Sequence, residues 1–270
     1  MILSLLKKSL YWSFTIVTGI STIISLWGYT IKDFNASWQW WKGGLVLGGC
    51  FAFLSGILFL ILLSQRHRPY QTVINGKRVV IKTGDIFAES GWKLIPFNDR
   101  FDTTVDDRII AHDSLNGKMI DAYVDDPNNL SNAIIAAGTD LSPFQSKVIN
   151  GHTVYPLGRV IPYNSFLLLA FSHFDQQNKA FIGIGEYEQM LIRMWSEIRR
   201  VYAAKPVSVP LIGTGITNIE GVPEKNYTDL LKCMLCTLKN SRFAPEKGIT
   251  IVLTQEAMDK VDMNVIKEEF

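Results

Sequence analysis

The stretch VSVPLIGTGITNI, residues 207–219, decides the fold: a β-branched apolar run ends at Pro210 and opens into a loop that contains Gly213 and Gly215. Glycine lacks a Cβ and reaches positive φ angles, so two glycines around Thr214 allow backbone N–H groups to converge on an anion. The stretch therefore predicts a phosphate-binding loop. The alternative is an ordinary strand-to-helix turn, since Gly-x-Gly alone is only part of a dinucleotide-binding fingerprint.

A second strand ending lies upstream, in VVIKTGDIF at residues 79–87. This β-branched run closes at Gly84 and Asp85, and a further apolar run, WKLIPF, follows at residues 92–97. The spacing predicts two short neighbouring strands.

Apolar runs and helical periodicities alternate along this part of the chain. We expect strands at residues 78–82, 93–97, 166–171, 207–211 and 249–253, and helices at 128–137, 186–203 and 227–238. This alternation predicts an α/β domain with a mixed sheet and helices on both faces. Ligands of such sheets bind at the carboxyl ends of the strands, where Asp85 and Gly213 both lie.

The order of these motifs resembles that of the macro-domain family over about residues 78–255. YPLGRV at residues 155–160, before an apolar strand, also matches the central region of that family. The resemblance implies that Asp85 accepts a hydrogen bond from the adenine amine of ADP-ribose, that the backbone at Ile86 reads neighbouring ring atoms, and that residues 210–216 wrap the diphosphate. The candidate ligand-binding residues are Gly84, Asp85, Ile86, Asn98, Phe101, Asp102, Leu211, Gly213, Thr214, Gly215 and Ile216.

The chain departs from the hydrolytic macro domains in LIPFNDRFDTTVDD, residues 94–107, where those enzymes carry a glycine-rich loop. Bulky and charged residues there favour ligand binding over catalysis, and we assign no catalytic residue. Asn98 is the candidate contact to the distal ribose, Phe101 a ring on which a ligand ring stacks, and Asp102 or Asp106 a partner for a basic ligand group. The alternative for these carboxylates is a solvated acidic loop.

The N-terminal part has a different composition, with no charged residue at 10–31 or at 43–64. Each stretch is long enough to cross a bilayer as a helix, and tryptophan and tyrosine residues flank both. A cleaved signal peptide is the competing interpretation of the first stretch, which is too long and lacks a small-x-small cleavage site. We expect a two-span transmembrane hairpin at residues 1–68 and a macro-like domain at residues 69–270.

Basic residues near the spans predict the orientation. Lys7 and Lys8 precede the first span, and Arg66 and Arg68 follow the second, so we expect both termini and the macro-like domain in the cytoplasm. The expected location is the cell membrane.

Small residues recur every fourth position along the second span, at Gly44, Gly48, Ala52 and Gly56. Such a stripe allows helix backbones to approach closely. It predicts either self-association into a homo-oligomer or packing against the first span of the same chain, and the sequence leaves both open.

Other candidates for chemistry are few. After residue 65 the acidic residues outnumber the basic ones by one, which disfavours nucleic acid as a partner. Cys233 and Cys236 form C-x-x-C in an apolar helix without a second pair, so we expect neither a metal nor a cofactor. His173 follows a strand and could lie near a pocket, although a lone histidine is more often structural.

The combination of hairpin and macro-like domain resembles the membrane-anchored macro-domain effectors of bacterial Thoeris anti-phage systems. The resemblance implies a TIR-domain partner enzyme that makes an ADP-ribose-derived signal, with histidine as the candidate attached group, which the macro-like domain binds. Assembly of the chains and disruption of the membrane would then follow in abortive infection. The rival function is a membrane-bound ADP-ribosyl hydrolase, and a structural anchor with a vestigial pocket ranks behind both.

Overall fold

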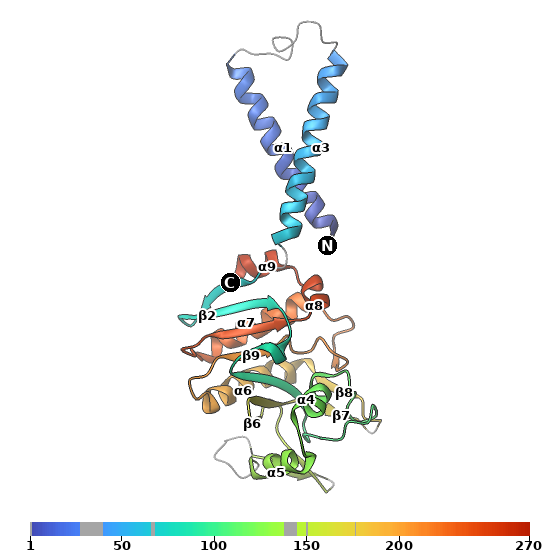
Figure 1. Cartoon of the computed structure of the whole chain (residues 1–270), viewed down its shortest axis with the longest axis vertical. Helices are drawn as coiled ribbons and strands as arrows, with labels where there is room; N and C mark the ends of the chain where they lie inside the picture. Colours follow the sequence, from blue (N-terminus) through green and yellow to red (C-terminus); the bar gives the residue numbers. More distant parts are fainter. Residues whose placement is uncertain (1, 28–39, 66–67, 138–144, 150, 176) are drawn as a thin grey trace. The chain divides into compact units, whose positions relative to one another are not determined.

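The computed structural model describes residues 2–27, 40–65, 68–137, 145–149, 151–175 and 177–270. Side chains at positions 2–5, 40–43 and 62–65 are not part of that description. The chain divides into two compact units, Met1–Arg68 and Pro69–Phe270, and each is described by itself (Figure 1).

The first unit consists of two helices, α1 (Ile2–Leu26) and α3 (Trp40–Gln65), which contact one another. Within them, Leu6–Leu26 and Gly44–Ile61 are long and apolar enough to cross a membrane. Hydroxyl groups in α1 donate to carbonyls of the preceding turn, as from Ser13 to Ser9 at 2.7 Å and from Thr22 to Thr18 at 2.8 Å. These side chains therefore satisfy their hydrogen bonds within the helix, as an apolar environment requires.

The stripe of small residues on α3 lies on its exposed side. A Cβ added at Gly44, Gly48 or Gly56 would meet no atom within 4 Å, whereas the buried Ser55 lies on another face. In this hairpin the stripe is therefore not the surface through which α3 packs against α1. Lys32 and Asp33, in the predicted loop, and the side chains of Lys42 and Arg66 lie outside the described residues.

The second unit is built on a nine-stranded mixed sheet in the order β1-β2-β11-β9-β3-β7-β8-β10, with β6 paired to β7. Strands β2, β11, β9, β3 and β7 run parallel. Strand β1 is antiparallel to β2, β6 and β8 are antiparallel to β7, and β10 is parallel to β8. The strands are β1 (Tyr70–Ile74), β2 (Lys77–Thr83), β3 (Trp92–Asn98), β6 (Val160–Tyr163), β7 (Phe166–Phe174), β8 (Ala180–Gly183), β9 (Val207–Pro210), β10 (Asn218–Glu220) and β11 (Ile249–Leu253). A separate hairpin joins β4 (Lys147–Ile149) to β5 (His152–Val154).

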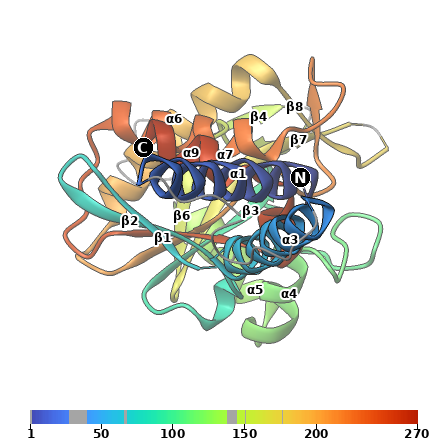
Figure 2. The ribbon, with the colours of Figure 1, turned by 90° about the horizontal axis from the view of Figure 1, so that it is seen from above.

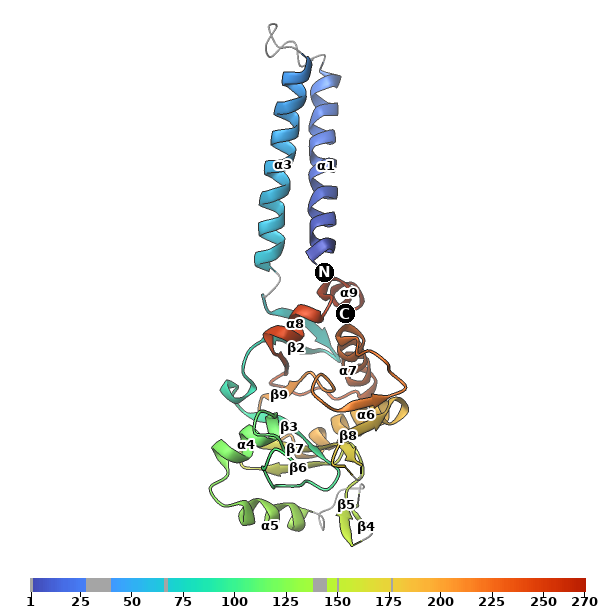
Figure 3. The ribbon, with the colours of Figure 1, turned by 90° about the vertical axis from the view of Figure 1, so that its right-hand side faces the viewer.

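Helices cover both faces of the sheet, so the predicted fold class is confirmed (Figures 2 and 3). On one face α6, α7, α8 and α9 enclose the larger apolar core, which contains Trp195 and Met234. On the other face α4 and α5 enclose the smaller core with Ile95 and Phe97. The helices are α4 (Leu115–Tyr123), α5 (Pro127–Ala137), α6 (Ile184–Val201), α7 (Tyr227–Ser241), α8 (Gln255–Lys260) and α9 (Met263–Glu269), with a short 3₁₀ turn η1 (Ile86–Ala88).

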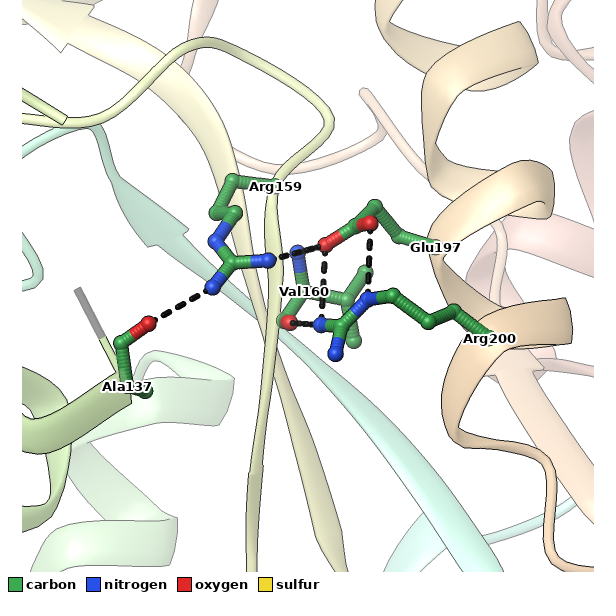
Figure 4. Close-up of polar contacts among 5 residues, drawn as sticks. All are labelled: Ala137, Arg159, Val160, Glu197 and Arg200. Carbon is green, nitrogen blue, oxygen red and sulfur yellow. Dashed lines mark hydrogen bonds and ion pairs between the residues drawn. The ribbon is translucent and has the colours of Figure 1, made fainter. Parts of the chain in front are cut away.

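A buried ion pair joins the two sides of the sheet at β6 (Figure 4). Arg159 donates to Glu197 of α6 at 2.5 Å and to the carbonyl of Ala137, the last residue of α5, at 2.7 Å. Arg200 also donates to the Glu197 carboxylate, at 2.9 Å. Because Arg159 and Glu197 are each only 1% exposed, the pair holds α5, β6 and α6 together away from water.

Candidate ligand-binding site

The Gly-Asp-Ile motif forms the turn after β2. The N–H of Gly84 donates to the carbonyl of Leu253 at 3.0 Å, which ties the turn to the neighbouring strand β11. Asp85 caps η1 by accepting from the N–H of Phe87 at 2.9 Å, and its carboxylate is exposed while Ile86 is buried. The buried Ile86 therefore fixes the turn and leaves the Asp85 carboxylate at the surface.

The glycine loop, which we define as residues 211–217, follows β9. Gly213 has φ +92°, and a Cβ there would lie 3.3 Å from both Tyr187 and Ile219, so the position favours glycine on two grounds. Gly215 is absent from the positive-φ positions of the described chain, so only one of the two glycines uses that freedom. Ile216 is 88% exposed at the tip of the loop.

The carbonyls of the glycine loop are held by side chains from the domain. Tyr187 of α6 donates to the carbonyl of Ile212 at 2.8 Å, Tyr227 donates to that of Thr214 at 3.1 Å, and the Lys225 ammonium donates to that of Gly215. Burial lowers the pKa of Lys225.

The backbone N–H groups of the glycine loop differ from its carbonyls in their hydrogen bonding. Within the described residues, the N–H groups of Gly213, Thr214, Gly215 and Ile216 donate to no acceptor. A loop with tethered carbonyls and free N–H groups is suited to an anion such as a diphosphate.

Asn98 ends β3 at a register shift and organises the loop that follows. Its Nδ2 donates to the Asp102 carboxylate at 2.5 Å, and its Oδ1 accepts from the N–H groups of Arg100 and Asp102 at 3.2 and 3.1 Å. Asn98 is only 4% exposed. The structure thus shows Asn98 and Asp102 bonded to each other.

Phe101 does not offer the open ring expected for stacking. It is 2% exposed and packs between Phe97 and Tyr155, with ring centroids 6.0 and 5.1 Å away. Its apolar ring completes the smaller core instead, which explains why it tolerates a φ of +53°. Asp106 is exposed and accepts from the N–H groups of Ile109 and Arg108, which lowers its pKa.

The sheet brings most of the candidate residues to one edge. Thr83, Leu253, Pro210 and Asn98 end the adjoining parallel strands β2, β11, β9 and β3. The carboxyl ends of neighbouring parallel strands meet at one edge of a sheet. The Gly-Asp-Ile turn, the glycine loop and Asn98 therefore line the same edge.

A cluster of which the sequence indicated only His173 lies at the same edge, next to Asn98. The carboxylate of the buried Asp99 is hydrogen-bonded to His173 Nδ1 at 2.6 Å. On the other side of the ring, His173 Nε2 lies 3.4 Å from the carboxylate of Glu186 in α6. The hydrogen bond to Asp99 raises the pKa of His173 above its ordinary value. The other Asp99 oxygen, Oδ1, is buried and has no partner within the described residues.

His173 and Glu186 border a cavity of about 310 Å³. Its lining residues are Lys147, Ile149, Val154, Tyr155, Pro156, Leu157, His173, Glu186, Gln189 and Arg193. The next residue of α6, Tyr187, holds the glycine loop through Ile212, so the first turn of α6 borders both features. The only sequence signal for this cavity was the position of His173 directly after an apolar strand.

The cysteine pair lies on α7. Burial raises the pKa of the Cys233 thiol to about 11. Within the described residues no group of three or more His, Cys, Asp or Glu side chains could hold a metal ion.

The mixed sheet with its Gly-Asp-Ile turn and glycine loop defines a macro domain, here preceded in the chain by two apolar helices. The family model described as Thoeris protein ThsA, Macro domain, matches residues 79–254. The Thoeris protein ThsA of Bacillus amyloliquefaciens (strain Y2) is 34% identical over 238 residues, which cover 83% of this chain and 77% of that protein. The chain belongs to the ThsA family of Thoeris anti-phage defence.

Solved structures of an Oceanobacillus iheyensis macrodomain are also similar. The structure with ADP is 16% identical and has a TM-score of 0.47, covering 75% of this chain and 98% of that chain. A mutant with ADPR, also 16% identical, has a TM-score of 0.48 and covers 75% and 99% of the two chains.

Proposed function

We propose that this protein is a membrane-anchored receptor and effector that binds an ADP-ribose-derived nucleotide signal. A TIR-domain partner enzyme makes the signal, and the ligand-bound chains assemble and disrupt the membrane in abortive infection. The observation that carries the proposal is the glycine loop. Its N–H groups at residues 213–216 donate to no acceptor in the described part of the chain, while its carbonyls accept from Tyr187, Tyr227 and Lys225.

In this proposal the glycine loop binds the diphosphate. The exposed Asp85 carboxylate accepts from the adenine amine, and Asn98 lies toward the distal ribose. Free N–H groups near a positively charged Lys225 bind an anion without any rearrangement of the loop.

The cavity beside His173 supports a ligand larger than ADP-ribose. It offers the carboxylate of Glu186 to an ammonium group and the cations of Lys147 and Arg193 to a carboxylate, which suits an amino acid such as histidine attached to the nucleotide. Tyr187 couples this cavity to the diphosphate loop, because a ligand that moves α6 also moves Ile212.

The membrane part of the proposal rests on α1 and α3. Both helices span the cell membrane, with both termini and the macro domain in the cytoplasm, as Lys7, Lys8 and Arg68 favour. The exposed stripe at Gly44, Gly48 and Gly56 is available to a second chain, which supports homo-oligomer formation. A ligand drives assembly only if it binds the assembled state more tightly than the resting state.

The proposal is tested by calorimetric binding of the fragment from Arg68 onward to ADP-ribose, NAD and amino-acid-linked ADP-ribose. We expect tight binding of the conjugate and weak binding of ADP-ribose, with Asp85→Ala abolishing both. Asp125→Ala, which removes an exposed carboxylate between α4 and α5, is the matched control. Absence of binding by every ligand would refute the receptor role.

The membrane step needs its own measurement on the full chain in liposomes. We expect dye leakage only after the conjugate is added. Binding without ligand-dependent leakage would reject membrane disruption and leave the receptor role intact.

A second function, ADP-ribosyl hydrolysis, is favoured by one observation, the buried Asp99 beside His173, which has the geometry of an acid–base pair. Turnover of an ADP-ribosylated substrate that disappears in both Asn98→Ala and His173→Gln would establish the hydrolase and displace the receptor.

A further inference from the structure

The sheet leaves one face open at its β1 end. Side chains in β2 alternate, so that Val79 and Ile81 enter the larger core while Arg78, Val80 and Lys82 point to the other face. The helices α4 and α5 cover that second face farther along the sheet, over β3 and β7. The strands β1, β2 and β11 therefore form the floor of a surface groove.

This groove has a volume of about 330 Å³, and we call it the basic groove. Its lining residues are Pro69, Gln71, Arg78, Val80, Lys82, Lys247, Gly248, Ile249 and Thr250. Three of them are cations and none is an acid. Gly248 has φ +76°, and a Cβ there would lie 2.6 Å from the Arg78 carbonyl, so this close approach brings Lys247 beside Arg78.

The cations of the basic groove are only partly neutralised. Lys82 pairs with Glu89 at 2.8 Å. Arg78 and Lys247 are exposed, and the described part of the chain supplies no ion-pair partner for either. The two free cations and the polar groups of Gln71 and Thr250 fit a phosphodiester, since an anion there replaces a missing counter-charge.

The position of the basic groove in the sequence indicates that the phosphodiester belongs to a membrane phospholipid. Pro69 lines the groove, and α3 ends at Gln65. Four residues of fully extended chain reach at most about 14 Å, whereas the headgroup layer on each side of a bilayer is only about 5–8 Å deep. The groove therefore begins within reach of the headgroups of any bilayer that α3 spans.

We propose that the basic groove binds the headgroups of anionic phospholipids and thereby holds the macro domain against the membrane surface. This inference rests on the membrane anchoring proposed above, but on neither the nucleotide signal nor leakage. Each cation near an anionic surface strengthens binding about fivefold, so removal of Arg78 and Lys247 lowers it about thirtyfold.

The test uses the full chain in lipid nanodiscs, either of phosphatidylcholine alone or rich in phosphatidylglycerol, and measures amide hydrogen exchange. In the anionic discs we expect slower exchange at residues 69–82 and 247–250, and this protection should weaken as salt is added. Arg78→Gln with Lys247→Gln should remove the difference between the two lipids. Lys118→Gln with Lys179→Gln, which removes two exposed cations elsewhere on the domain, should leave it unchanged.

Several outcomes would overturn the proposal. Equal exchange in both lipids, or lipid-dependent protection that persists in the groove variant, would show that the headgroups bind elsewhere. Protection in phosphatidylcholine discs on addition of inorganic phosphate, without a difference between lipids, would identify a free-phosphate site. Failure of the chain to enter the discs would refute the membrane anchoring, and with it this inference. Normal signal binding by the groove variant would show that the receptor role does not depend on the groove.

Discussion

Removal of the Glu197 carboxylate should destabilise the macro domain more than loss of any exposed ion pair. Glu197 is 1% exposed and accepts from Arg159 at 2.5 Å and from Arg200 at 2.9 Å. In Glu197→Ala the Arg159 guanidinium stays buried and keeps only its bond to the Ala137 carbonyl among the partners shown in Figure 4. Breaking one side of a buried pair costs about 3–5 kcal/mol, which is two to four powers of ten in the folding equilibrium.

Two further variants separate the charge from the packing. Glu197→Gln retains an acceptor of similar shape and should cost less than Glu197→Ala. Arg159→Met with Glu197→Leu removes both charges, and because no buried ion is left alone the double variant should be more stable than Glu197→Ala. Arg200 is partly exposed, so Arg200→Ala should cost about 1 kcal/mol or less.

The assay is urea unfolding of the fragment 69–270, which forms a compact unit with its own core. At about 2 kcal/mol per molar urea, the expected loss in Glu197→Ala shifts the midpoint down by about 1.5–2.5 M. The reasoning is refuted if Glu197→Ala costs less than about 1 kcal/mol. It is also refuted if the costs of Arg159→Met and Glu197→Leu, each measured alone, add up to the cost of the double variant, since additivity would mean that the groups do not interact.

Three other predictions concern the ligand-binding edge. Gly213→Val should lower the melting temperature and abolish ligand binding in calorimetry, because a side chain at φ +92° costs about 1–3 kcal/mol and contacts Tyr187. An unchanged affinity would show that the glycine loop is not part of the site. Tyr187→Phe leaves the buried Ile212 carbonyl without its donor and should cost about 1–3 kcal/mol in urea unfolding, with weaker ligand binding as the sign that loop geometry matters. The pKa of His173 is raised in the folded state, so its bond to Asp99 stabilises the folded domain fully below about pH 6.5. This stability is lost as the pH rises through the raised pKa. His173→Gln should therefore flatten the dependence of the urea midpoint on pH over that window.

Local sequence patterns predicted the central elements of the macro domain. Strands expected at 78–82, 93–97 and 249–253 correspond to β2, β3 and β11, and helices expected at 186–203 and 227–238 correspond to α6 and α7 within a few residues. These elements carry strong periodicity over several turns or a continuous β-branched run, and such signals are contained within a short window. The short strands β6, β8 and β10 and the helices α8 and α9 have too few residues to produce one.

For the candidate site, the sequence predicted the positions of some residues and not of others. Gly84, Asp85 and Gly213 lie at strand ends that the sheet brings to one edge, as the chain order of the motifs implied. Phe101 faces the core instead of a ligand, because the bulged end of β3 turns it toward Tyr155. A single residue of register decides which of two neighbouring side chains points outward, and no local pattern in residues 94–107 specifies that register.

The sequence by itself determined the division into an apolar hairpin and an α/β domain, the class of the sheet and the glycine loop, because each depends on residues that are close in the chain. Only the tertiary structure decided which distant groups meet. Asp99 bonds to His173, Arg159 to Glu197 and Tyr187 to Ile212 through the order of the strands and the packing of α6. Hydrophobic periodicity is a property of one segment, whereas a polar contact depends on two segments whose relative register is set by the whole core.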